Sequence, residues 1–166
     1  MQMNFLVIGL TALVPMLVGF IWYHPNVMGK MWMEACGFKE DDLKGGNMAL
    51  IMGISLILSF LLAFSLQFMV IHQFALFSIV ENHPAYSTPG TPENTWMMGF
   101  LKEHEHCFRS FKHGALHGFI GSVFTILPVL GTNALFERKG GKYIFVNWAY
   151  WAITMTIMGG ILGQWA

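Results

Sequence analysis

Hydrophobic and charged positions follow one another along this chain in long blocks. All Lys, Arg, Asp and Glu side chains fall within residues 30–44, 81–112 and 137–142, which leaves residues 1–29, 45–80, 113–136 and 143–166 uncharged. A helix needs about 20 apolar residues to cross a bilayer core of ~30 Å, and each uncharged run is long enough. A charge at the bilayer centre costs ~2.5–3.5 kcal/mol or more, so its absence from these runs is informative. The pattern predicts an all-α integral membrane bundle of four antiparallel transmembrane helices.

The spans are expected at about residues 3–23, 48–70, 114–136 and 143–165, in a single membrane domain covering residues 1–166. The second uncharged run is longer than a bilayer requires, because residues 47–80 as one helix would measure ~50 Å. We therefore expect the second helix to extend beyond the membrane, to about residue 80.

Two amphipathic helices are expected in the loops. Residues 27–35 place Met28, Met31 and Trp32 on one face, which suits either the membrane surface or packing against the bundle. In the second loop, Thr91 as N-cap and Pro92 at the first helical position start another helix. That helix can run directly into the third span.

Small residues recur on several helix faces, where they allow two helices to approach closely. The expected packing residues are Gly53, Ser55, Ser59 and Ala63 in the second span, Gly114, Gly118 and Gly121 in the third, and Gly159, Gly160 and Gly163 in the fourth.

The charged residues predict the orientation of the chain in the membrane, and their balance argues against nucleic acid as a partner. The formal net charge is zero, so no basic surface for nucleic acid is expected. Six Lys and Arg residues lie in the first and third loops and three in the second. Because positive residues favour the cytoplasmic side, both termini and the second loop are expected outside.

Histidine is the one residue type that suggests a chemical site. Five of the seven histidines lie between residues 83 and 117. His113 and His117 are four residues apart, so both can reach one metal ion from the same helix face, and His106 shares that face if the helix is continuous. His72 belongs to the same side of the membrane. Histidines at a membrane boundary commonly form ordinary hydrogen bonds, so no cofactor is the first expectation. The alternative is a Zn, Cu or haem site at these four residues.

Several segments resemble a known family: residues 19–25 (GFIWYHP), 42–48 (DLKGGNM), 111–118 (FKHGALHG), 131–138 (GTNALFER) and 147–151 (NWAYW). Together they are similar to small bacterial four-span membrane proteins that form a domain of unknown function. The FKHGALHG segment resembles the form found in Bacteroidetes-type bacteria. The resemblance implies a bacterial envelope protein, and it implies no activity, cofactor or catalytic residue.

The leading functional expectation is a non-enzymatic accessory or assembly subunit of the bacterial inner membrane. The uncharged runs offer small-residue faces but no Asp, Glu, Lys or Arg for a proton or ion pathway, and no catalytic residues are expected. Its partners would be the lipid bilayer and other membrane proteins, or a second copy of the chain. The alternatives are the metal or haem protein described above and a small transporter or lipid-binding protein.

Overall fold

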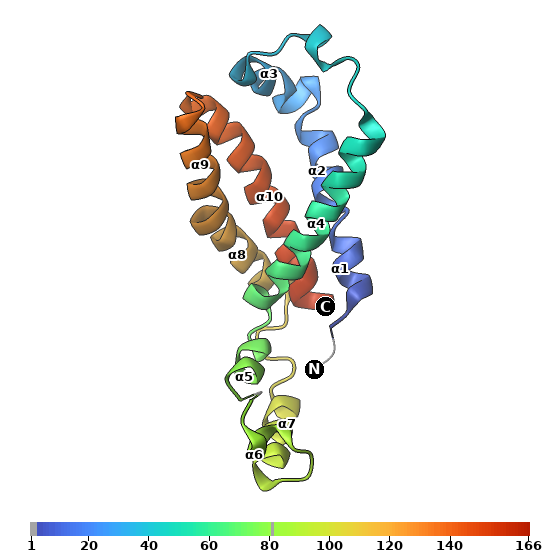
Figure 1. Cartoon of the computed structure of the whole chain (residues 1–166), viewed down its shortest axis with the longest axis vertical. Coiled ribbons are helices and arrows are strands. Elements are labelled where there is room, and N and C mark those ends of the chain that lie inside the picture. Colours follow the sequence, from blue (N-terminus) through green and yellow to red (C-terminus); the bar gives the residue numbers. More distant parts are fainter. Residues whose placement is uncertain (1–2, 81) are drawn as a thin grey trace.

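The computed structural model describes residues 3–80 and 82–166, and these residues form helices and no strand (Figure 1). Helices long and apolar enough to cross a membrane occupy Phe5–Trp22, Met48–Val70, Phe111–Phe136 and Gly141–Trp165. The all-α membrane fold expected from the charge blocks is confirmed, and these helices fit a multi-pass membrane protein.

The elements follow the chain in a simple order. The first span comprises α1 (Phe5–Thr11) and α2 (Val14–Trp22), and a π-helical turn (Pro25–Gly29), α3 (Lys30–Cys36) and a 3-10 turn (Glu40–Leu43) follow it. The second span is α4 (Met48–Val70), and α5 (Gln73–Val80), α6 (Pro84–Ser87) and α7 (Pro92–Glu103) form the second loop. The last two spans are α8 (Phe111–Gly121) with a π-helical turn (Ser122–Ile126) and α9 (Leu127–Phe136), then α10 (Gly141–Trp165).

Polar caps set where several helices begin. The Asn47 side chain accepts a hydrogen bond from the Leu50 amide at the start of α4, and Thr91 does the same for Asn94 in α7. Ser110 accepts from the amide of His113 at the start of α8. Each cap satisfies a backbone donor that has no partner within its own helix. The cap expected at Thr91 is confirmed.

The second loop differs from its sequence-based expectation at both ends. Ile71 takes an extended conformation (φ −102°, ψ 94°), so the helix expected to continue to about residue 80 is interrupted between α4 and α5. Helix α7 ends at Glu103, seven residues separate it from the start of α8, and it does not run directly into the third span. Tertiary hydrogen bonds, which no local pattern predicts, bridge the two interruptions. Gln73 Nε2 donates to the carbonyls of His104 and Cys107, 3.0 Å away in each case.

In Figure 1 the elements α5, α6 and α7 lie together beyond one end of the long helices. We call the two chain segments that join this part to the long helices, residues 71–73 and 104–110, the neck. The N-terminal end of α1 and the C-terminal end of α10 lie near the same level, where Asn4 Nδ2 donates to the Trp165 carbonyl over 3.3 Å.

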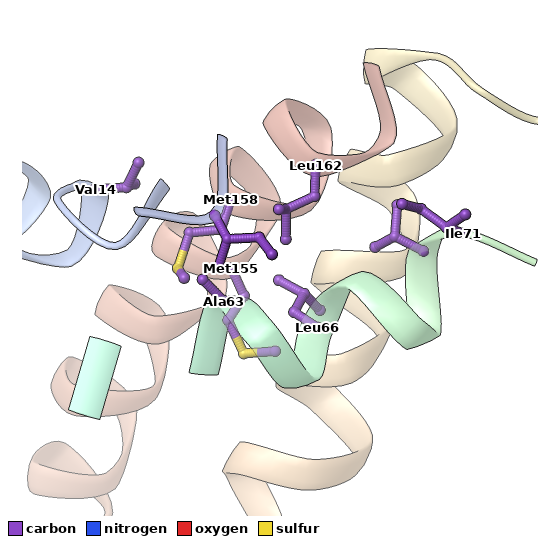
Figure 2. Packing of buried hydrophobic residues seen from close by; sticks show 9 residues of the cluster. Val14, Ala63, Leu66, Ile71, Met155, Met158 and Leu162 are labelled. Atoms are coloured by element: carbon purple, nitrogen blue, oxygen red, sulfur yellow. The ribbon is translucent and has the colours of Figure 1, made fainter. Parts of the chain in front are cut away.

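The apolar core lies where α10 meets α4 and the first span (Figure 2). Met155, Met158 and Leu162 of α10 are at most 2% exposed and pack in one cluster with Ala63 and Leu66 of α4. Lipid tails are as apolar as these side chains, so van der Waals packing, rather than removal from water, stabilises this contact between helices.

Glycine sets the separation of α8 and α10. A methyl group added at Gly114 would overlap the Gly159 carbonyl, and one added at Gly118 would overlap the Met155 carbonyl. A carbon added at Gly163 would lie 2.9 Å from the Gly114 Cα. Only residues without a side chain permit this approach of two backbones.

The remaining expected packing residues are distributed differently. Added carbons at Gly160 and Gly121 would meet the Phe111 ring and two methionine side chains. In α4, Ser59 and Ala63 are buried and Ser55 is half-buried, but Gly53 has nothing within 4 Å of an added carbon. The N-terminal half of the α4 stripe is therefore open.

Helix α3 packs against the protein. The Trp32 ring contacts Tyr23 edge-on with centroids 5.4 Å apart, and Glu34 pairs with Lys142 at 2.6 Å. Lys139 also donates to the Cys36 carbonyl over 3.0 Å. Of the two placements open for this amphipathic segment, these contacts favour packing on the long helices.

Candidate metal centre

Three histidine side chains meet where the neck joins the long helices. His72 lies in the break between α4 and α5, and His113 and His117 lie on successive turns of α8. One ring nitrogen from each of the three lies within 4.8 Å of the others. The described residues contain no second group of this kind.

The contacts among the three rings are close. The Nε2 atoms of His72 and His113 are 2.9 Å apart, a hydrogen-bond distance in which one ring donates and the other accepts. The His117 ring lies 4.8 Å from that of His72 and 4.5 Å from that of His113, measured between centroids. Among residues 3–80 and 82–166, the His117 side chain has no hydrogen-bond partner.

Local structure explains how the histidines come together. The Ser110 cap starts α8 three residues before His113, and the spacing of four residues then puts His117 on the same helix face. His72 reaches them because α4 stops at Val70, and Gln73 is tied to the far side of the neck. A continuous helix through residue 80 would not have this break at His72.

Two neighbours of the site were not indicated by the sequence. Gln73 joins both segments of the neck through its side-chain amide. The Phe108 ring lies against His72 and His113, with centroids 5.7 and 5.0 Å away, and its backbone has a positive φ of 60°. No periodicity could have identified either residue, because both act across an interruption of helix.

His106 does not join the group. Its expected position on the α8 face required a continuous helix, whereas the structure places it in the neck between α7 and α8. Its Nε2 lies 3.3 Å from a Glu105 carboxylate oxygen, and its side chain is 90% exposed. The four-residue ligand set expected from sequence is thus reduced to three.

Three imidazoles in this arrangement offer three nitrogen ligands to a small ion. Neutral imidazole nitrogen binds Zn²⁺ and Cu²⁺, and Zn–N bonds of ~2.0–2.1 Å in a tetrahedral site place the nitrogens ~3.3 Å apart. The nitrogens here span 2.9 to 4.8 Å, so small side-chain rotations would produce that spacing. The fourth position would be open to water or another ligand.

One known family matches nearly the whole chain. The model of DUF1761, described as a protein of unknown function, matches residues 6–163. The chain belongs to the DUF1761 family. No curated protein and no solved structure matches it. Membership in DUF1761 agrees with the resemblance to a domain of unknown function, and this family description names no ligand for the three histidines.

Proposed function

We propose that this protein is a non-enzymatic membrane protein that holds one divalent transition-metal ion, Zn²⁺ or Cu²⁺, through His72, His113 and His117. The observation that carries the proposal is the meeting of three imidazoles from two distant segments, His72 and His113 being 41 residues apart. The group of three contains no carboxylate among the described residues, which favours ion binding over acid–base chemistry.

A simple hydrogen-bonded pair is the competing explanation. The contact between His72 and His113 would satisfy one nitrogen of each ring without any ion. It gives no role to His117, whose ring completes the group and lacks a hydrogen-bond partner among the described residues. A metal site requires a third ligand, whereas a hydrogen-bonded pair of histidines does not.

The geometry favours an ion over haem. Two axial imidazoles bind haem iron from opposite faces of a flat macrocycle, which must fit between the two rings. The Nε2 atoms of His72 and His113 are in direct contact at 2.9 Å and leave no space for such a ring.

A second candidate function is assembly with another membrane protein or with a second copy of the chain. The expected packing glycines of α8 and α10 are occupied by packing within the chain, but Gly53 is open. Ile54 and Ile57 beside it are 50% and 63% exposed. A helix of a partner could approach α4 there. Without a partner, lipid would cover this face of α4.

We place the protein in the bacterial inner membrane, with helices crossing in alternating directions and the second loop outside. The positive residues of the first and third loops support this orientation. The three histidines would then lie at the outer boundary of the membrane, accessible to ions from outside the cytoplasm.

Metal content of the protein purified in detergent tests the proposal. After incubation with Zn²⁺ and removal of excess ion, we expect about one zinc per chain in the wild type, because three ligands are in place. His113→Ala and His117→Ala should lose the ion, and His106→Ala, an exposed histidine outside the group, should retain it. Equal zinc in all four proteins, or none in the wild type, would contradict the proposal.

A further inference from the structure

Phe108 occupies an unusual position beside the three histidines. Its ring lies 5.7 Å from the His72 ring in an edge-on arrangement and 5.0 Å from the His113 ring. The side chain is nevertheless 64% exposed. One part of the ring therefore covers the imidazoles and the rest faces the surroundings of the protein.

The backbone at Phe108 indicates that this position is imposed. Its φ of 60° lies in the left-handed region, which is uncommon for a bulky side chain and costs nothing to glycine. Such a conformation persists where neighbouring contacts hold it. Here the Cys107 carbonyl accepts a hydrogen bond from Gln73, and the Phe108 carbonyl accepts one from the Ser110 amide over 3.1 Å.

Both facts have one explanation if the ring serves the metal site. We infer that Phe108 is a positioning residue that covers one side of the His72–His113–His117 site, fixes the orientation of two imidazoles and slows release of the ion. The inference rests on the proposed function. Residues that contact metal ligands without touching the metal commonly change affinity ~10–100-fold when they are replaced.

Another role for an exposed aromatic residue at this level is anchoring in the lipid headgroup region. An anchor would contribute to membrane placement and leave ion release unchanged. The two roles are therefore separated by a rate measured on the metal itself.

The experiment uses Co²⁺ as the probe, because its visible absorption reports ligand binding. The full chain in detergent is loaded with Co²⁺ and mixed with excess EDTA, and the loss of the bound-cobalt band gives the release rate. In Phe108→Gly we expect release at least about tenfold faster than in the wild type. Phe108→Tyr, which keeps the aromatic ring, should release cobalt at the wild-type rate.

Arg138→Gly is the matched control. Arg138 is the other non-glycine residue with positive φ among those described, at 57°, and it lies in the turn between α9 and α10. Glycine relieves the backbone at both positions, so neither variant should lower the metal-free melting temperature. Only the Phe108 variant should change cobalt release.

The outcomes separate the inference from the function on which it rests. A wild type that never holds cobalt overturns the proposed metal function. A wild type that holds cobalt while Phe108→Gly releases it at the same rate overturns the covering role alone. If Phe108→Gly melts earlier than the wild type, Phe108→Asn replaces it, because Asn also tolerates positive φ, and an unchanged rate there overturns the role equally.

Discussion

At the scale of single residues, the two described non-glycine residues with positive φ play different parts. Arg138 follows α9 in a left-handed conformation, and the Lys139 amide donates to the Ala134 carbonyl over 2.8 Å. This is the usual way for a helix to end, with glycine the favoured residue at the left-handed position. At Phe108 the same conformation places a ring on two candidate ligands.

Relieving the backbone at Arg138 should stabilise the protein. Arg138→Gly removes the contact between Cβ and the backbone that left-handed residues suffer, which we expect to add about 1 kcal/mol to the free energy of unfolding. The measurement is reversible unfolding in mixed detergent. A loss of stability would show that the Arg138 side chain makes a compensating contact.

At the scale of helices, the separation of α8 and α10 is decided by their glycines. Gly118→Ala would force its methyl group into the Met155 carbonyl, which is backbone and cannot rotate away. We expect a loss of ~1–3 kcal/mol in the free energy of unfolding, as for overpacked cores. Gly53→Ala is the matched control, because nothing lies within 4 Å of the added carbon.

The control should change stability in the opposite direction. Alanine favours a helix interior over glycine by ~0.5–1 kcal/mol, so Gly53→Ala should be neutral or stabilising. The melting temperatures of Gly118→Ala and Gly53→Ala, measured in the same detergent, test whether the first is destabilised and the second is not. If α4 meets a partner at Gly53 in the membrane, Gly53→Ala should reduce cross-linking to that partner in membranes, while the melting temperature of the isolated chain stays unchanged or rises.

The contact between α3 and the start of α10 gives a pH dependence. The hydrogen-bonded ammonium group of Lys142 holds the pKa of the Glu34 carboxyl below its ordinary value of 4.5. A depressed pKa in the folded state stabilises the fold above pH ~4.5, and this contribution disappears as the pH falls through the folded pKa.

Because the Glu34 side chain is exposed, the effect on stability is small. We expect Glu34→Gln to narrow the difference in melting temperature between pH 7 and pH 3 relative to the wild type. The check is thermal unfolding of both proteins at the two pH values. An identical difference in the two proteins would show that the ion pair contributes nothing to the pH dependence.

At the scale of the whole molecule, the two cysteines report the orientation in the membrane. Cys107 lies exposed in the neck and Cys36 half-buried at the end of α3. With the second loop outside, a membrane-impermeant maleimide added to intact cells should label Cys107 and leave Cys36 unlabelled until the membrane is opened. Cys36→Ser and Cys107→Ser identify each signal, and the reverse pattern would invert the proposed orientation.

The sequence by itself determined which segments are apolar enough to lie in lipid, and hence the fold class. Charged side chains are too costly in lipid, so their absence located the four apolar helices from local composition alone. Helix starts such as Asn47 and Thr91 were equally predictable, since a cap acts within three residues. The pair His113 and His117 also followed from spacing on one helix.

Tertiary structure alone decided the rest of the site. His72 joins the pair and His106 leaves it because helices stop at Val70 and Glu103, and hydrogen bonds from Gln73 join the two segments of the neck beyond these stops. The position of Phe108 likewise depends on contacts between distant segments. Local propensity carries no information about such contacts, because their free energy exists only once both segments of the neck are side by side.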